Sequence, residues 1–404
     1  MSPTVLIAGA GHGAGQVVAT LKQHKYEGRI VLVGDEPYLP YQRPPLSKKF
    51  LSGEMPPERL YFKPASFYDD PQIEVYLDTH IREVDREAGC VRTDEGEQLG
   101  FDTLVMATGS RARRLPVAGS DLDGIHYLRN IGDVDGIHAD TRTAKRIVIV
   151  GAGYIGLEVA AVARQLGLEV TVIEMADRVL SRVVSEQVST FYQDEHRSRG
   201  VELLLSTGLR AFRGNGRVSG VETDDGTVLP ADLVVVGVGI LPNTELAQAC
   251  SLEVDDGIIV DDMCRTSDPD IYAIGDCTSQ PNGIYGRTLR LESVHNALEQ
   301  AKTAASNICG IETHYCQVPW FWSDQYDLKL QIAGLSQDYD AVVVRGRPED
   351  RSFACLYLRQ GRLIAVDAIN APRDFVQSKP LIENHAVIAP EKLADTSVML
   401  KDLA

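Results

Sequence analysis

The feature that most constrains this chain is a pattern that occurs twice: an apolar strand, a glycine-rich turn, a helix, a second strand and an acidic residue. Hydrophobic periodicity predicts the first copy as a strand, a helix and a strand at Thr4–Ala8, about Gly13–Gln23 and Arg29–Val33. It predicts the second copy as a strand, a helix and a strand at Arg146–Val150, Tyr154–Leu166 and Glu169–Ile173. Each copy continues to another apolar strand that ends in small residues, within 101–109 and 231–239. This duplication predicts two parallel sheets covered on both faces by helices.

The first glycine set is typical of a dinucleotide-binding turn. It reads Gly9-Ala10-Gly11-His12-Gly13-Ala14. The first glycine permits the tight turn, the second lets the backbone approach a pyrophosphate, and the small third position lets helix and strand pack closely. Asp35 and Glu36 follow the second strand, where a carboxylate accepts hydrogen bonds from a ribose diol. Such a set alone often marks only a turn, but the complete unit predicts a nucleotide site.

The second set has all three glycines. It reads Gly151-Ala152-Gly153-Tyr154-Ile155-Gly156 and is followed by Glu174. A carboxylate at Glu174 would repel the 2′-phosphate of NADPH and accept a hydrogen bond from the free hydroxyl of NADH, so NADH is the expected nucleotide. Two alternatives remain open at this point: Glu174 is a solvated acid at a strand end, or Arg178 serves a phosphate.

Two dinucleotide sites on one chain indicate one tightly held cofactor and one exchanging substrate, because hydride transfer needs a donor and an acceptor ring. FAD with NADH is the natural pair. Asp276 follows a further apolar strand, well separated from the first glycine set, and either belongs to the FAD site or ends a simple turn.

The bulk properties set limits on the class of protein. With 404 residues, the chain is expected to form two or three domains. The formal charge of −17 disfavours nucleic acid and anionic membranes as partners. The chain has no basic leader and no apolar run of about 20 residues, so a cytoplasmic location is expected.

The chain contains seven cysteines, and no two of them form a Cys-x-x-Cys pair. This spacing gives no indication of a disulfide framework or of a metal site, and most of the cysteines are expected to be buried.

The pattern changes beyond Trp322. Apolar and polar residues alternate within 328–368, as in Leu328–Ala333 and Phe353–Leu358, which predicts antiparallel strands with one solvated face. A helical end from about Arg373 to Leu393 follows. We therefore expect a third, α+β domain near residues 323–404.

Five motifs stand out along the chain: Pro44-Pro45-Leu46-Ser47-Lys48, Ala107-Thr108-Gly109, Gly151 to Glu158, Tyr272-Ala273-Ile274-Gly275-Asp276 and Pro319-Trp320-Phe321-Trp322-Ser323-Asp324-Gln325. Together they resemble one family, the bacterial FAD-dependent NADH:ferredoxin reductases of the putidaredoxin reductase type, which serve cytochrome P450 or ring-hydroxylating dioxygenase systems. The resemblance covers essentially the whole chain. It implies a glutathione reductase-like α/β fold with two Rossmann-type domains and a C-terminal α+β domain. It also implies an FAD domain at 1–112 and 243–322, an NADH domain at 113–242 and a C-terminal domain at 323–404.

The resemblance also assigns residues to the FAD site. Asp276 would bond the FAD ribitol, and the backbone at Ser293 and Val294, where a helix through Gln300 begins, would face the flavin pyrimidine. A helix N-terminus there stabilises negative charge on reduced flavin. Arg43 and Lys48 would lie beside the isoalloxazine. The small residues Thr108, Gly109 and Gly239, at the ends of later strands, would also contact cofactor. Ala14 departs from the family's third glycine but is small enough to preserve FAD binding.

Lys48 and Glu158 are the predicted catalytic pair. The resemblance places the lysine near flavin N5 and the glutamate across the nicotinamide pocket, so an ion pair between them is expected; read alone, each could be an ordinary surface residue. Trp322, and less directly Trp320, would lie at the flavin edge below a [2Fe-2S] ferredoxin. Five cationic residues in the flanking segments would form a local basic dock for an acidic ferredoxin, unless they are solvated or paired within the chain: Arg287, Arg290, Lys329, Arg345 and Arg347.

Two other functions occur among proteins that share these motifs or this fold. Disulfide and peroxide reductases of this fold need a reactive thiol, usually in the segment that is Pro44 to Leu51 here, and this segment contains no cysteine. Cys277 is expected to be a packed small residue. The second is a redox-regulated binding protein resembling apoptosis-inducing factor, which shares Pro44 to Lys48 and Glu158 but is associated with leaders and basic nucleic-acid-binding surfaces. A ferredoxin reductase is therefore the preferred interpretation.

Overall fold

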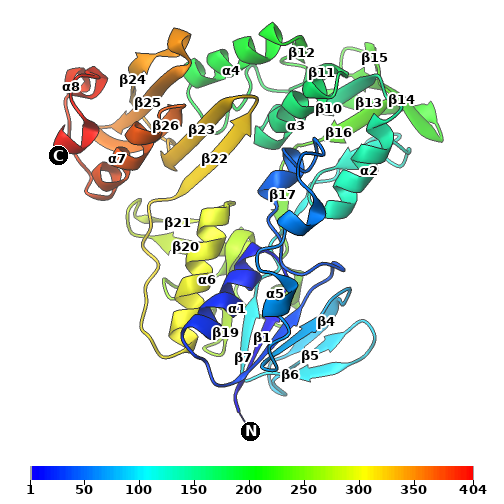
Figure 1. Cartoon of the computed structure of the whole chain (residues 1–404), viewed down its shortest axis with the longest axis vertical. Coiled ribbons are helices and arrows are strands. Elements are labelled where there is room, and N and C mark those ends of the chain that lie inside the picture. Colours follow the sequence, from blue (N-terminus) through cyan, green and yellow to red (C-terminus); the bar gives the residue numbers. More distant parts are fainter. Residues whose placement is uncertain (1, 404) are drawn as a thin grey trace. The chain divides into compact units, whose positions relative to one another are not determined.

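The computed structural model describes residues 2–403, in two compact units (Figure 1). The first unit comprises Met1–Arg43, Pro57–Arg111 and Leu241–Pro319, of which Met1 is not described. The second comprises Pro44–Pro56, Ala112–Ile240 and Trp320–Ala404, of which Ala404 is not described.

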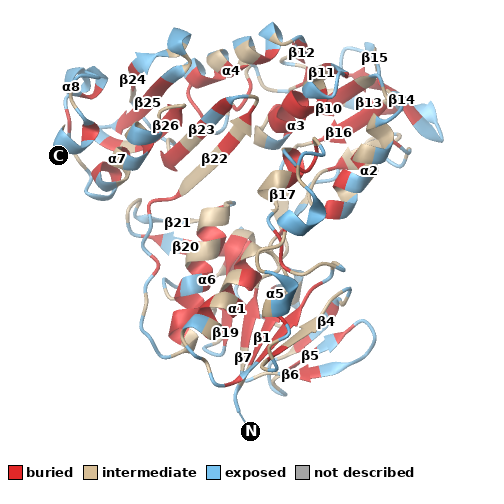
Figure 2. Cartoon of the chain, viewed as in Figure 1, coloured by how far each residue is buried: buried red, intermediate tan, exposed pale blue. Residues whose placement is uncertain are grey.

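The first unit is built on a parallel sheet with strand order β19-β7-β1-β2-β3. The strands are β1 (Thr4–Ala8), β2 (Arg29–Val33), β3 (Ile73–Tyr76), β7 (Thr103–Met106) and β19 (Ile271–Ala273). Helices α1 (His12–Gln23) and α6 (Val294–Ile308) pack against each other, and both contribute to the apolar core on one face of the sheet. In Figure 2 the strands of this sheet and the inner sides of both helices are buried.

Smaller elements complete the first unit. The antiparallel sheet β4-β5-β6 contributes to the second core, on the other face of the parallel sheet. Its strands are Ile81–Asp85, Cys90–Thr93 and Gln98–Gly100, and short helix α5 (Glu245–Ala249) packs beside β4. A further three-stranded sheet consists of β18 (Ile258–Ile259), β20 (Thr278–Asn282) and β21 (Arg287–Leu289). The 3-10 helices of this unit are η2 (Pro57–Arg59), η3 (Ala65–Phe67) and η4 (Gly275–Cys277).

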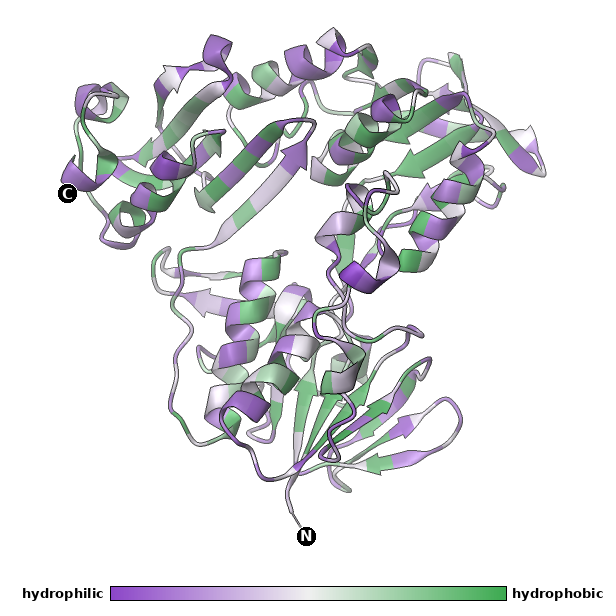
Figure 3. Cartoon of the chain, viewed as in Figure 1, coloured by the Kyte–Doolittle hydropathy of each residue, from purple (hydrophilic) through white to green (hydrophobic). Residues whose placement is uncertain are grey.

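The second unit contains a second parallel sheet, with order β12-β11-β10-β16-β9. Its strands are β9 (Ile125–Tyr127), β10 (Arg146–Val150), β11 (Glu169–Ile173), β12 (Val201–Leu204) and β16 (Leu233–Val236). The associated helices are α2 (Ile131–Thr141), α3 (Tyr154–Gln165) and α4 (Glu186–Ser198), and the antiparallel sheet β13-β14-β15 covers Leu209–Asn215, Arg217–Thr223 and Val228–Pro230. The central strands of both parallel sheets are strongly apolar (Figure 3), as expected for strands buried on both faces.

The second unit also contains an antiparallel sheet with order β22-β23-β26-β25-β24. Its strands are β22 (Trp320–Gln325), β23 (Leu328–Gly334), β24 (Ala341–Arg347), β25 (Ser352–Arg359) and β26 (Arg362–Ile369). Helix α7 (Pro372–Glu383) packs on β23 and β26, and α8 (Pro390–Ala394) packs on β24. The 3-10 helices are η1 (Pro44–Ser47), η5 (Pro348–Asp350) and η6 (Leu400–Leu403). Strands β8 (Ser110–Ala112) and β17 (Ile240–Pro242) pair with each other and contain the points at which the chain passes between the units.

The predicted duplication is confirmed, and four strands have the expected bounds: β1, β2, β10 and β11. The helical end predicted from about Arg373 to Leu393 is present, and it consists of two helices with a break between them. Helix α7 ends at Glu383, His385 takes a left-handed backbone conformation with φ of 51°, and α8 begins only at Pro390. Proline at 390 disfavours helical geometry at Ala389, so the two helices cannot be continuous. Within the described residues, no helix is long and apolar enough to cross a membrane.

Candidate functional site

The first glycine turn follows β1 and leads into α1. Gly9 has φ of 118°, and a Cβ there would lie 2.3 Å from the carbonyl oxygen of Ala107, so only glycine fits. Gly11, by contrast, faces open space: nothing lies within 4 Å of where its Cβ would be. Gly11 precedes the first residue of α1, where backbone N–H groups point outward. The turn therefore forms a cradle that fits a pyrophosphate, as FAD binding requires.

The second turn has the same geometry after β10. Gly151 has φ of 101°, and its Cβ would meet the Gly237 oxygen at 2.5 Å, whereas the space beside Gly153 is open. A Cβ at Gly156 would lie 2.0 Å from the Gly151 oxygen, which explains why this third position is glycine. Gly239, at the end of β16, also has a positive φ of 101° and an open side, and its carbonyl accepts the Arg113 N–H. This second cradle fits the pyrophosphate of a nicotinamide nucleotide.

Glu174 directly follows β11 and is fixed by the second turn. One carboxylate oxygen accepts the Ala152 N–H at 2.7 Å and the other accepts the Ala176 N–H at 2.9 Å. Arg178 points elsewhere: its guanidinium donates to the carbonyls of Ser181 and Val184 and to the Ser189 hydroxyl. Of the alternatives left open by the sequence, phosphate binding by Arg178 is therefore disfavoured, and Glu174 is a preorganised acid at the glycine turn.

The two acids after β2 differ in their surroundings. Glu36 accepts hydrogen bonds from the Tyr41 hydroxyl and the Arg43 guanidinium, both at 2.6 Å. Asp35 is exposed. Arg43, predicted to lie beside the isoalloxazine, is thus part of an ion pair with Glu36, which leaves Asp35 as the more accessible of the two carboxylates.

Asp276 lies in η4, immediately after β19. Its carboxylate accepts the Ser110 hydroxyl at 2.7 Å, and the preceding Gly275 N–H donates to the side-chain carbonyl of Gln300 at 2.7 Å. Thr108 and Gly109 follow β7, and both are hydrogen-bonded to Asn243. These bonds fix the loops that follow two neighbouring parallel strands at the edge to which ligands bind in such sheets.

Helix α6 begins where the sequence predicted. Ser293 is its N-cap and accepts the Asn296 N–H at 3.1 Å, and Val294 is the first helical residue. Three buried side chains support this end of the helix through mutual hydrogen bonds: Asn296, Gln300 and Gln280. A rigid helix N-terminus of this kind can stabilise an anionic ring.

Lys48 and Glu158 form the predicted ion pair. The Lys48 ammonium lies 2.7 Å from one carboxylate oxygen of Glu158, which also accepts the Ser47 hydroxyl. The other oxygen accepts the Ser323 hydroxyl at 2.6 Å. Glu158 is only 2% exposed, and this burial raises its pKa, while Lys48 and the two hydroxyls act in the opposite direction. A buried carboxylate with three donors is a preorganised polar site beside the second nucleotide turn, since Glu158 lies in the first turns of α3.

The aromatic residues of β22 lie on alternating faces. Trp320 and Trp322 have ring centroids 5.5 Å apart, and Lys379 lies 4.7 Å from the centre of the Trp320 ring. On the other face, Phe321 stacks on Tyr154, with centroids 4.7 Å apart, at the start of α3. Trp322 is half-buried, whereas Ile155, beside the second glycine turn, is exposed at 41%.

The basic dock predicted from five residues needs correction at Arg345, which is 4% exposed. Its guanidinium pairs with Asp374 at 3.0 Å and donates to the carbonyls of Leu393, Asp395 and Val398. Arg345 is buried because it holds the C-terminal segment against β24, so its charge is not available to a partner.

The other four cations of the dock differ in their pairing. Arg290 pairs with Asp256 at 3.0 Å and with Glu292, and its side chain is 17% exposed. Arg347 lies 3.8 to 3.9 Å from Glu349 and Asp350. Lys329 and Arg287 are exposed. Pairing within the chain therefore holds for Arg290, Arg345 and Arg347.

The cysteines are all unpaired thiols, and four of the seven are buried: Cys90, Cys264, Cys277 and Cys355. Cys277 packs after Asp276, and burial raises the pKa of its thiol, which disfavours a reactive thiolate. Among residues 2–403 there is no group of three or more His, Cys, Asp or Glu side chains that could hold a metal ion.

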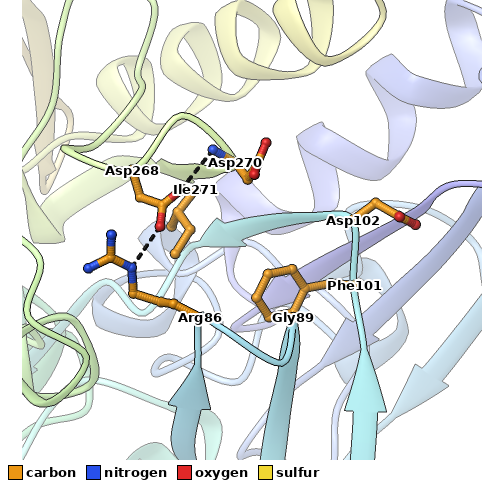
Figure 4. A pocket seen from close by; sticks show the side chains of 7 residues that line it. All are labelled: Arg86, Gly89, Phe101, Asp102, Asp268, Asp270 and Ile271. Carbon is orange, nitrogen blue, oxygen red and sulfur yellow. Dashed lines mark hydrogen bonds and ion pairs between the residues drawn. The ribbon is translucent and has the colours of Figure 1, made fainter.

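A small polar pocket in the first unit lies away from the nucleotide edge of its sheet (Figure 4). Its lining is Arg86, Gly89, Phe101, Asp102, Asp268, Asp270 and Ile271. It is bordered by the residues that begin β7 and β19, and Arg86 is paired with Asp268. Ligands of parallel sheets bind at the carboxyl ends of the strands, so this pocket is not the dinucleotide site.

Sequence reasoning missed the polar residues around Glu158. Ser47 and Ser323 lie within two of the family motifs and hydrogen-bond Glu158, and Gln325 and His196 extend the hydrogen bonds behind Ser323. The sequence contained one indication of their burial: Ser323 and Gln325 alternate with outward residues and lie on the same side of β22 as Phe321.

Comparison with known proteins identifies the family. Residues 3–301 match the profile described as "Pyridine nucleotide-disulphide oxidoreductase", and residues 320–404 match "Reductase C-terminal". A protein named Ferredoxin–NAD(P)(+) reductase fdr, from Sphingomonas sp, is 45% identical over 389 residues, which cover 96% of this chain and 94% of that protein. Rhodocoxin reductase from Rhodococcus erythropolis is 42% identical over 399 residues, with 98% and 93% covered. The chain belongs to the ferredoxin reductase family. It is therefore an oxidoreductase, and its family uses FAD and NAD(P)H.

A solved structure agrees with this assignment. The crystal structure of the covalent putidaredoxin reductase–putidaredoxin complex matches with a TM-score of 0.96 at 40% identity, covering 99% of this chain and 98% of that chain. The family resemblance and the fold class predicted from the sequence are thus confirmed. In that structure the related reductase is joined to a partner protein, putidaredoxin.

Proposed function

We propose that this member of the ferredoxin reductase family takes electrons from NADH and passes them through FAD to a [2Fe-2S] ferredoxin that feeds a cytochrome P450 or a ring-hydroxylating dioxygenase. The observation that carries this proposal is the presence of two complete glycine cradles on one chain, each with an open side at its second glycine, Gly11 and Gly153. When bound, FAD supplies the conversion of a hydride from NADH into two electrons that leave one at a time.

We assign FAD to residues 1–112 and 243–322, NADH to 113–242, and a C-terminal α+β domain to 323–404. In the FAD part, Gly9, Gly11 and Ala14 form the pyrophosphate turn, and Asp35 or Glu36 bonds the ribose. Asp276 bonds the ribitol. The N-terminus of α6 at Ser293 and Val294 stabilises the negative charge of the reduced ring, with support from the bonds among Asn296, Gln300 and Gln280.

In the NADH part, Gly151, Gly153 and Gly156 hold the pyrophosphate and Glu174 bonds the ribose. Both Glu174 oxygens accept backbone N–H groups, which keeps the carboxylate in place at the turn. A fixed negative charge there repels a 2′-phosphate, and Arg178 is engaged in other bonds. NADH is accordingly the preferred donor.

Lys48 and Glu158 order the reacting rings. Ser47 and Ser323 hold the Glu158 carboxylate, and the carboxylate holds the Lys48 ammonium. Neither side chain would need to act as a base, because the two bound cofactors would exchange a hydride directly. Trp322 lies at the flavin edge in this assignment and contributes an aromatic surface to the ferredoxin contact. We also assign the reaction to the cytoplasm, in keeping with seven unpaired cysteines.

The test is anaerobic reconstitution. The purified protein should be yellow with noncovalent FAD, NADH should bleach the flavin faster than NADPH at equal concentration, and catalytic amounts should then reduce a [2Fe-2S] ferredoxin. A protein that stays colourless after refolding with FAD would contradict the assignment. Fast flavin reduction followed by a long-lived complex with NAD+ and no ferredoxin reduction would instead favour a redox-regulated binding protein.

A further inference from the structure

Behind Glu158, the second unit contains a row of buried polar side chains that the reaction itself does not use. Ser323 and Gln325 come from β22, and His196 comes from α4; all three are fully buried. Tyr326, which follows Gln325 and is half-buried, ends the row. Buried polar groups of this kind are costly unless each is hydrogen-bonded.

The row is continuous. The Ser323 hydroxyl donates to Glu158 at 2.6 Å, and the Gln325 side-chain NH₂ donates to the Ser323 oxygen at 3.2 Å. The Gln325 side-chain oxygen lies 2.9 Å from His196 Nε2, and His196 Nδ1 lies 3.0 Å from the Tyr326 hydroxyl. Four hydrogen bonds therefore connect Glu158 to a half-buried tyrosine.

These contacts fix the direction of every bond. Because the Gln325 oxygen faces His196 Nε2, that nitrogen must carry the proton, which leaves Nδ1 to accept the Tyr326 hydroxyl. Burial lowers the pKa of His196 to about 4, so the ring is neutral near pH 7. All four bonds then point their donors toward Glu158, and aligned donors favour a carboxylate over a carboxylic acid.

The charged and titratable groups around the row come from several elements. Lys48 is the cation that contacts Glu158 directly. Burial is the main cause of the raised pKa of Tyr154 on α3 and of Tyr192 on α4, and the charge of nearby Glu158 adds to it. Asp367 on β26 lies near both tyrosines, and burial raises its pKa to about 7. In addition to the larger effect of burial, Arg199 at the end of α4 lowers the pKa of His196 and Glu195 raises it. The Arg199 guanidinium lies over the Tyr326 ring at 4.3 Å.

We propose that Ser323, Gln325 and His196 are positioning residues that keep Glu158 ionised and fixed against Lys48 through this directed row of hydrogen bonds. This proposal rests on the proposed function at one point, which is the role of Glu158 and Lys48 in ordering the reacting rings. His196 has a specific part, although it does not touch Glu158. By donating to the Gln325 oxygen, it prevents that amide from turning its oxygen toward Ser323, where it would compete with Glu158 for the serine proton.

The test measures the titration of Glu158 itself. FAD-loaded protein carrying ¹³C at the glutamate side-chain carboxyl is titrated by NMR, and Glu158→Gln identifies the resonance; glutamate labelling keeps Asp367 out of the spectrum. Gln325→Leu and His196→Leu should each raise the titration midpoint of Glu158 by about one pH unit. His196→Gln, which retains an N–H donor, should restore most of the wild-type midpoint. Ser378→Ala, which removes a buried hydroxyl of α7 that donates to the Phe375 carbonyl, should leave it unchanged.

The pH profile of flavin reduction by NADH should move in the same direction as the midpoint in each variant. An unchanged Glu158 midpoint in both Gln325→Leu and His196→Leu would overturn the proposal, and so would a uniform loss of rate with no change in the pH profile. A wild-type protein whose flavin NADH does not reduce would refute the proposed function instead, and the NMR comparison would still decide whether the row controls Glu158.

Discussion

Replacement of Lys48 by methionine tests the ion pair most directly. Methionine keeps an unbranched apolar stem of similar length but removes the ammonium that lies 2.7 Å from Glu158. Glu158 is 2% exposed and cannot gain water as a substitute partner without local rearrangement. The variant therefore leaves a buried charge without its cation, a change that typically costs about 3–5 kcal/mol.

Protonation of Glu158 sets an upper limit on that cost. A glutamate with the ordinary pKa of 4.5 requires about 3.4 kcal/mol to be protonated at pH 7, at about 1.4 kcal/mol per pH unit. Burial already raises the pKa of Glu158 in the folded chain, and loss of Lys48 raises it further. A carboxyl group with a higher pKa in the folded state binds more protons there than in the unfolded chain. The free energy of unfolding of the variant therefore falls as pH rises above 4.5 and recovers as pH falls.

Urea unfolding of the wild type and of Lys48→Met at pH 7 and pH 5.5 checks this reasoning. We expect a loss of about 3 kcal/mol at pH 7, and about 2 kcal/mol of it should be recovered at pH 5.5. The matched control is Lys49→Met, which removes an exposed neighbouring cation and should change stability by less than about 0.5 kcal/mol at either pH. The double variant Lys48→Met/Glu158→Gln should lose the pH dependence. A Lys48→Met penalty that is equal at both pH values would refute the buried-charge argument.

Three further outcomes follow from the described contacts. Arg345→Met should destabilise the C-terminal sheet by about 3–5 kcal/mol in urea unfolding, because Asp374 and three backbone carbonyls lose a buried donor; a change below about 1 kcal/mol would contradict this. Glu174→Ala should reduce the ratio of kcat/KM for NADH to that for NADPH by about tenfold, equivalent to about 1.4 kcal/mol, and an unchanged ratio would show that Glu174 does not discriminate. If cations steer an acidic ferredoxin, ferredoxin reduction should slow as salt rises and in Lys329→Glu, while flavin reduction by NADH stays constant; indifference to both changes would remove the basic dock.

The nucleotide-binding elements were predictable because their determinants are local. Strands β1, β2, β10 and β11 are short apolar runs bounded by glycine or charged residues, and their predicted bounds agree with the structure. The three small positions of each turn are separated by fixed spacings that the backbone geometry requires, as Gly9 and Gly151 show by their positive φ angles. Fold class and cofactor type follow from this repeated local pattern.

The burial of Arg345 could not be predicted, because it depends on residues that are distant in the sequence. An arginine followed by Gly346 and Arg347 looks like part of a solvated strand end, and its position in β24 says nothing about the distant segment that covers it. Its partners, Asp374 and the carbonyls of residues 393, 395 and 398, lie about 30 to 50 positions further along the chain. Only the packing of α8 and the following residues against β24 turns a predicted surface charge into a structural one.

Ser323 and Gln325, behind Glu158, were only partly predictable, because their place on the strand and their polarity point to different surroundings. Alternation correctly puts Phe321, Ser323 and Gln325 on one face of β22, but a polar residue on such a strand is normally assigned to the solvated face. With Phe321 against Tyr154, however, the same face must be buried at 323 and 325. Two polar side chains at buried positions require hydrogen-bond partners. Ser323 bonds the Glu158 carboxylate and Gln325 bonds the His196 ring, and both partners belong to the second unit. A conflict between strand alternation and polarity is therefore informative in its own right: it marks the place where a strand supports a buried charge rather than an apolar core.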